Sequence, residues 1–129
     1  MSGQAGAAVI AAAMAALREI GGLTGIHEAM PLQAASPYAT IEAGLESDWS
    51  HKSGSGRETR LTVTLRDQGE RPTRLRGLAA EVAAALEEIG PELEGWRLVT
   101  LNFVRSMTVA ESAGRWALTI DYRARMLAD

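Results

Sequence analysis

The stretch ESDWSHKSGSGRETRLTVTL, residues Glu46 to Leu65, joins a polar, glycine-containing segment to a strictly alternating one. In its second half apolar and polar residues alternate, the period of two expected of a strand in a sheet that is wet on one face. The apolar positions are Leu61, Val63 and Leu65, and the polar ones are Arg60, Thr62, Thr64 and Arg66. The first half allows three interpretations: a glycine-rich ligand loop, a flexible linker between domains, or the tip of a long hairpin used for assembly.

The residues before this stretch predict one helix and two strands. Residues 4–20 are rich in alanine, the best helix former, and Gly21 and Gly22 are expected to end that helix. A short strand is expected from Gly25 to Ala29, before Pro31. A longer strand, Tyr38 to Glu46, would place one set of apolar residues on a single face: Ala39, Ile41, Ala43 and Leu45.

The residues after the stretch predict a helix followed by two strands. Apolar residues recur at spacings of three and four over residues 73–89, which indicates an amphipathic helix that Gly90-Pro91 stops. Strands are expected from Trp96 to Met107 and from Trp116 to Arg125, on either side of a loop with the sequence TVAESAGR.

This order, α-(β)-β-β-α-β-β, predicts an α+β fold. We expect an antiparallel or mixed sheet of four to five strands with two helices packed on one face. A chain of 129 residues buries roughly two-thirds of its unfolded surface and suits one domain, so residues 1–129 are expected to form a single domain.

Composition excludes several classes of function. The net charge of −3 provides no basic field for nucleic-acid binding, and the absence of cysteine excludes disulfides, thiol nucleophiles and cysteine-bound metal. The apolar run from Ala5 to Leu17 is not preceded by a positive region and is too short to span a bilayer. We therefore expect a soluble intracellular product.

The titratable residues do not predict an enzyme. His51 lies three residues after Asp48, but this pair lacks the ligand count of a metal site, and His27 suits a surface or packing position. The segment GSGRET leads into a strand, whereas phosphate loops open a helix, and Ser55 lacks the strand–turn–helix context of a catalytic elbow. No catalytic residue, metal or cofactor is expected.

The residues of the opening stretch leave an interface and a local packing role both open. Trp49 has no local apolar neighbours, so it either folds back under the hairpin or docks into another subunit, where tryptophan is enriched. Alternation places Glu42 and Glu46 on the face of Tyr38, and the outward Arg60 and Arg66 are opposite to them in charge. Either self-association or solvated cross-strand pairing would explain this charge pattern.

The ordered set of motifs resembles the tail-completion, or tail-terminator, family of long-tailed phages and gene-transfer particles. The motifs are PYATIEAGLESDWSHKSGSGRETRLTVTLR, the helix RLRGLAAEVAAALEE and GWRLVTLNFVRSMTVAESAGRWALTIDYRARM, after an Ala/Leu-rich N-terminal helix. The resemblance covers about residues 8 to 126. The chain departs from the family pattern at IHEAMPLQAA, where relatives often have a more aromatic strand.

The resemblance implies a structural virion protein without catalysis or cofactor. Such proteins form a ring, generally a hexamer, at the head-proximal end of the tail tube, where they stop polymerisation and join the tail to the neck of the DNA-filled head. The implied partners are further copies of the chain, the tail tube protein and a neck or head-completion protein, with DNA passing through the lumen without specific binding and no membrane. The implied location is the tail–neck junction of a virion or phage-like particle, reached from the host cytoplasm during assembly.

On this interpretation the Asp48–Arg57 loop carries contacts to a neighbour or to the tube. The candidate interface residues are Trp49, Lys52, Arg57 and Arg60. The alternative is a small intracellular binding module that uses the open sheet face for a peptide or small ligand. Ring formation separates the two, because a binding module should remain monomeric or dimeric.

Overall fold

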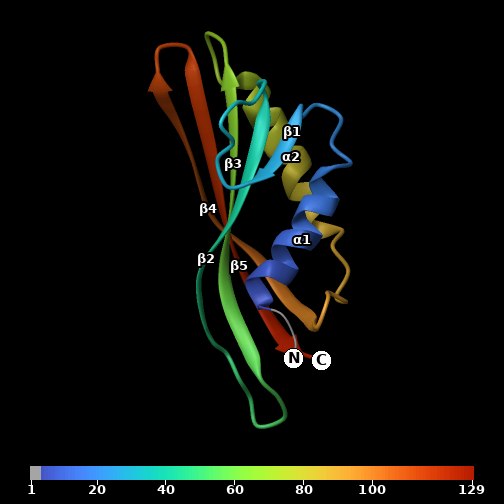
Figure 1. The fold of residues 1–129 in the computed structure, drawn as a ribbon. Coiled ribbons are helices and arrows are strands. Elements are labelled where there is room, and N and C mark those ends of the chain that lie inside the picture. The colour runs from blue at the N-terminus through green and yellow to red at the C-terminus, as the bar shows by residue number, and fades with distance from the viewer. Residues whose placement is uncertain (1–3) are drawn as a thin grey trace.

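A computed structural model describes residues 4–129 and confirms the predicted α+β fold and element order (Figure 1). The elements, in chain order, are α1 (Ala5–Leu17), β1 (Gly25–Glu28), β2 (Tyr38–Asp48), β3 (Gly56–Gln68), α2 (Thr73–Glu87), β4 (Trp96–Ser112) and β5 (Arg115–Ala128).

The strands form one twisted sheet in the order β1-β2-β3-β5-β4. The short β1 runs parallel to β2, and all other neighbouring strands are antiparallel. Both helices lie on the same face of the sheet, as Figure 1 shows, so within residues 4–129 no helix covers the opposite face. We call that opposite face the outer face. The edges of the sheet are β4 on one side and β1, with the part of β2 that extends beyond it, on the other.

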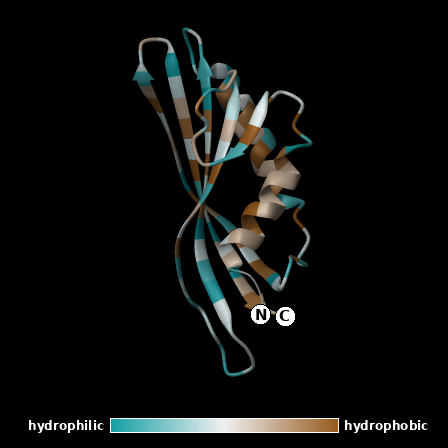
Figure 2. Cartoon of the chain, in the orientation of Figure 1, coloured by the Kyte–Doolittle hydropathy of each residue, from teal (hydrophilic) through white to brown (hydrophobic). Residues whose placement is uncertain are grey.

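The core lies between the sheet and the two helices. Leu61, Val63 and Leu65 of β3 are fully buried, as their alternation predicts. They pack with residues of both helices and of β5, among them Val9, Leu17, Leu75, Val82, Ile120 and Met126. Burying one such side chain stabilises the fold by about 1.5–3 kcal/mol. In Figure 2 hydrophobic colours concentrate in the helices and in the strands behind them.

Small residues allow α1 to approach the sheet closely. Ala5 and Ala13 are fully buried, and a Cβ placed on Gly6 would lie 3.2 Å from the Cβ of Ala43 in β2. The small residues of α1 therefore allow a short distance between the helix and the sheet, and its alanines also favour helix formation. Both helices end two or three residues before the predicted boundaries, yet Ile20 and Ile89 beyond them still pack on the core.

A bulge in β2 makes the predicted facing of two residues wrong. The pairing of β2 with β3 shifts register between Ala43 and Glu46, so alternation does not continue through this segment. Leu45 is consequently 83% exposed instead of lying in the core. Glu46 turns toward α1, where its Oε1 accepts a 2.9 Å hydrogen bond from the backbone N–H of Gly6. Glu46 thus leaves the face that it was expected to share with Glu42.

The prediction that TVAESAGR forms a loop is also wrong, because most of this segment is strand. β4 and β5 extend to Ser112 and Arg115, so only Ala113 and Gly114 make the turn, with Gly114 at a φ of +71° that suits glycine. Three register shifts along β4, the first between Leu98 and Thr100, interrupt the alternation that would have revealed its length. Within residues 4–129, neither helix is long and apolar enough to cross a membrane.

Candidate functional site

The β2–β3 hairpin projects beyond the body of the molecule. Figure 1 shows its end extending past both helices and both termini, and Figure 2 shows largely hydrophilic colours along this part. Its two strands pair from Tyr38↔Arg66 down to Asp48↔Arg57. The opening stretch of the sequence is therefore a paired hairpin, which excludes the domain-linker and phosphate-loop interpretations of it.

Short hydrogen bonds close the tip of this hairpin. The backbone N–H of Trp49 donates to the carbonyl of Gly56 over 2.9 Å, and the N–H of His51 donates to the carbonyl of Gly54 over 2.8 Å. The hydroxyl of Ser50 donates to Asp48 Oδ1 at 2.6 Å and accepts from the N–H of Gly56 at 3.1 Å. A Cβ at position 56 would lie 2.3 Å from the carbonyl oxygen of Trp49, so the close strand approach there requires glycine.

Trp49 packs on its own chain while staying partly exposed. The imidazole of His51 meets its ring edge-to-face with 4.5 Å between ring centroids. The guanidinium of Arg125, from β5, lies 5.6 Å from the ring centroid, within the range of a cation–π interaction. The indole therefore holds the hairpin against the end of β5 and also presents an aromatic surface beside the tip.

The four candidate residues do not form one cluster. Trp49, Lys52 and Arg57 lie in the hairpin, with Lys52 exposed at its tip. Arg57 faces the helix side, opposite Met126, and lies 3.7 Å from Glu46 and 3.5 Å from Asp48. Arg60 lies on the outer face instead, because it is three positions further along a strand whose side chains alternate.

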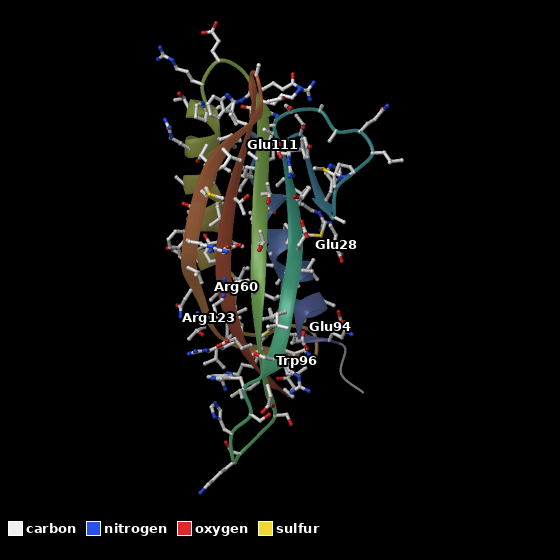
Figure 3. All side chains as sticks on the ribbon, turned by 90° about the vertical axis from the view of Figure 1, so that its left-hand side faces the viewer. Glu28, Arg60, Glu94, Trp96, Glu111 and Arg123 are labelled. Carbon is white, nitrogen blue, oxygen red and sulfur yellow. The ribbon has the colours of Figure 1, made fainter. Side chains whose placement is uncertain are left out.

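Arg60 stands directly opposite Arg123 across β3 and β5. Figure 3 looks onto the outer face, where both residues are labelled. Like charges in directly opposed positions disfavour the pairing of the strands. Within the described chain Arg60 has no carboxylate partner within ion-pair distance, whereas Arg123 lies 3.9 Å from Glu58. The charges of Arg60 and Arg123 both act on Glu58, and that of Arg60 also acts on Asp121, so nearby carboxylates partly balance the pair.

The rest of the outer face carries ion pairs that sequence reasoning missed. Arg125 donates to Glu58 at 2.7 Å, and Arg105 donates to Asp121 at 2.8 Å. The hydrogen bond from Arg125 lowers the pKa of Glu58, and that from Arg105 lowers the pKa of Asp121. A third pair joins Arg66 to Glu111 over 3.1 Å. The first two contacts link neighbouring strands of the sheet and the third links the strands on either side of β5, so only the strand register could have indicated them.

The residues weighed for chemistry remain apart. Asp48 accepts a hydrogen bond from Ser50 and lies 3.5 Å from Arg57. The ring of His51 packs against Trp49. Across residues 4–129, no three side chains of His, Cys, Asp or Glu gather as a metal would require. His27 packs edge-to-face with Tyr38, with 6.1 Å between their ring centroids, as a residue of the β1–β2 pair. This arrangement provides paired charges and aromatic surface for contact.

A sequence profile for a known family matches almost the whole described chain. The family is described as tail completion protein gp17, and the match covers residues 5–127. The chain belongs to this family. The resemblance stated from the sequence is thereby confirmed, and the protein has a structural role in the tail of a phage or phage-like particle. It therefore assembles with other proteins of that particle, and a structural family agrees with the expected non-catalytic role.

A solved structure shares the fold. The structure titled "Virion of native gene transfer agent (GTA) particle" contains a chain that aligns with a TM-score of 0.68 and 24% identity. The alignment covers 98% of this chain and 100% of that one. No curated protein matches the sequence significantly.

Proposed function

We propose that this tail completion protein forms a hexameric ring on the head-proximal end of the tail tube. The ring ends tube polymerisation and joins the tail to the neck of the DNA-filled head, leaving a lumen for DNA. Its partners are further copies of the chain, the tail tube protein and a neck protein. Assembly takes place in the host cytoplasm, and residues 1–129 act as a single domain.

The observation that carries this proposal is the projecting β2–β3 hairpin in a chain of the tail completion family. Trp49, Lys52 and Arg57 belong to this hairpin, and we assign to them the contacts with the tube or a neighbouring subunit. Arg60 adds positive charge on the outer face, next to Arg123. One hydrophobic core shared by both helices and the central strands supports a single domain. The net charge of −3 suits a lumen that should not hold DNA phosphates.

The test is a tube-capping assay with the tail tube protein of the same particle. Electron microscopy of tubes polymerised with and without the protein measures tube length and the structure at tube ends. We expect wild-type protein to give shorter tubes, each with a ring at one end. Trp49→Ala and Arg57→Glu should bind fewer ends and let tubes grow longer.

The end of the molecule opposite the hairpin tip offers matched controls (Figure 1). Trp116→Ala removes a partly buried indole whose N–H donates to the carbonyl of Gly69, and Arg71→Glu reverses an exposed charge in the turn before α2. Both variants should cap tubes as wild type does. If wild-type protein neither binds tubes nor changes their length, the proposed function is wrong, and the outer face should be screened for peptide or small-ligand binding.

A further inference from the structure

The exposed hydrophobic residues gather at the two opposite edges of the sheet. Residues 4–129 expose seven large apolar side chains. Four of them lie on the edge strand β4: Val99, Phe103, Met107 and Val109. The other three, Met30, Leu32 and Leu45, lie on β2 or on the segment that joins β1 to β2. In Figure 3 β4 and the β1–β2 side bound the sheet on opposite sides. Apolar residues gathered in this way mark interaction sites.

The β4 edge presents a groove as well as exposed side chains. This groove has a volume of about 410 Å³ and lies between α2 and the strands β4 and β5. A separate hollow of about 450 Å³ lies between the two helices. The groove at the β4 edge is lined by Ala79, Ala80 and Ala83 of the helix and by Phe103 and Tyr122 of the strands. The Phe103 ring is 61% exposed and meets Tyr122 edge-to-face. Short alanine side chains and one exposed ring leave room for apolar side chains from a partner.

The β1–β2 edge presents protruding side chains beside a hollow of about 350 Å³ that lies between α1 and the two strands. Leu32 is fully exposed in the segment between the two strands, and the β2 bulge turns Leu45 outward. β1 pairs only with Tyr38 to Ile41, so the remainder of β2, from Glu42 onward, is a free edge. The two edges therefore differ in what they present: a groove lies against α2 at the β4 edge, and Leu32 and Leu45 protrude at the β1–β2 edge.

The charges on the two edges are also complementary. Glu28 and Glu42 are exposed on the β1–β2 edge, and within residues 4–129 neither has a cationic partner within ion-pair distance. Arg97 on β4 and Arg76 at the groove are likewise exposed, with no carboxylate partner at that distance in the same part of the chain. Glu87 of α2 does not line the groove, although its charge acts on Tyr122, which does. Opposite charges at the two edges would orient one copy on the next.

We infer that the β1–β2 edge of one copy docks into the β4–α2 groove of the next copy. This inference rests on the proposed function and identifies the subunit contact of the ring. Two different surfaces on opposite sides of one chain make a head-to-tail contact, which generates a closed ring when the rotation closes. A symmetric dimer would instead require one surface that matches itself.

Cross-linking in the cysteine-free chain tests this contact. Ser47→Cys places a thiol on the β2 edge next to Leu45, and Asn102→Cys places one on β4 next to Phe103; both positions are exposed. Ala11→Cys, on the exposed side of α1, is the control. The variants are assembled on tail tubes, singly and as mixtures, and treated with a short bismaleimide.

The expected result is cross-linked dimer from the Ser47→Cys and Asn102→Cys mixture but not from either variant alone. The yield of this dimer should be on the order of tenfold higher than the yield from the mixtures that contain Ala11→Cys. The reason is that a docked neighbour holds the two thiols at roughly millimolar effective concentration. A chain carrying both changes should give a ladder that ends at the ring size, and adding Phe103→Asp should abolish it.

Two results would overturn the inference. Equal cross-linking by Ser47→Cys alone would indicate a symmetric contact, and capped tubes without the mixed cross-link would show that the ring uses other surfaces. In the second case the proposed function stands while this contact fails. A mixed cross-link and ladder without any effect on tubes would support the contact and refute tube capping. If the protein neither caps tubes nor gives the mixed cross-link, the proposed function and the proposed contact are both wrong.

Discussion

Gly56→Ala should destabilise the protein strongly, whereas Gly54→Ala, two residues away, should not. A Cβ at position 56 would lie 2.3 Å from the carbonyl oxygen of Trp49 and 3.0 Å from that of Met126. Both obstacles are backbone atoms, so no side-chain rotation relieves the contact. A Cβ on Gly54 meets nothing within 4 Å. The two variants thus make the same chemical change at positions that differ in the space available.

The cost follows from the hydrogen bonds next to residue 56. Moving the backbone by the required distance disturbs the bond from Trp49 N–H to the Gly56 carbonyl and the bond from Gly56 N–H to Ser50 Oγ. It also disturbs the bond from Ala128 N–H to the Ser55 carbonyl, which ties the hairpin to the end of β5. At about 1 kcal/mol each, these bonds give a loss of up to about 3 kcal/mol. Overpacking costs in the range of about 1–3 kcal/mol agree with this size.

Urea denaturation followed by circular dichroism measures the difference. We expect the free energy of unfolding to fall by about 2–3 kcal/mol in Gly56→Ala and to change by less than about 0.5 kcal/mol in Gly54→Ala. Equal stabilities for Gly56→Ala and wild type would show that the hairpin tip is not packed as described. Equal losses in both variants would refute the steric reason given for Gly56.

Three further predictions test the bulge, the α1 contact and the ion pair between the buried Asp67 and the exposed Arg74. Leu45→Ala should cost less than about 0.5 kcal/mol and Leu61→Ala about 2–5 kcal/mol in the same denaturation assay; similar costs would contradict the bulge. Glu46→Ala should lower the free energy of unfolding by about 1 kcal/mol, because it removes the acceptor for the Gly6 N–H, and amide hydrogen exchange should become faster first in α1. Unchanged exchange in α1 would refute the contact. The hydrogen bond from Arg74 lowers the pKa of Asp67 below 3.8, so its stabilisation is present above about pH 3.8 and is lost as the pH falls further. The stability gap between wild type and Asp67→Asn should therefore shrink from pH 7 to pH 3, and a constant gap would exclude that role.

Local patterns in the sequence predicted most of the fold. Alternation over β3 located its core-facing residues because β5 pairs with β3 along its full length in unbroken register, whereas the register with β2 shifts once. Spacings of three and four located α2, whose buried residues Leu75, Leu78, Val82 and Leu86 form one face. These signals depend on a residue's near neighbours in sequence, so one chain is enough to detect them.

The features that the sequence did not predict depend mainly on the register between paired strands. Nothing local indicates the β2 bulge, because Leu45 continues the apolar alternation and only pairing with β3 turns it outward. The ion pairs of the outer face, such as that of Arg105 with Asp121, require the register of β4 on β5. Phe103 could have been noted as the only phenylalanine of the chain, but its exposure follows from the position of α2.

Cryo-electron microscopy of tail tube ends, prepared with and without this protein, tests the central claim most directly. The account predicts one ring of copies of this chain at a single end of each tube, with β2–β3 hairpins reaching the tube or a neighbouring subunit. Tubes whose ends look the same with and without the protein, and that grow to the same length, would contradict it.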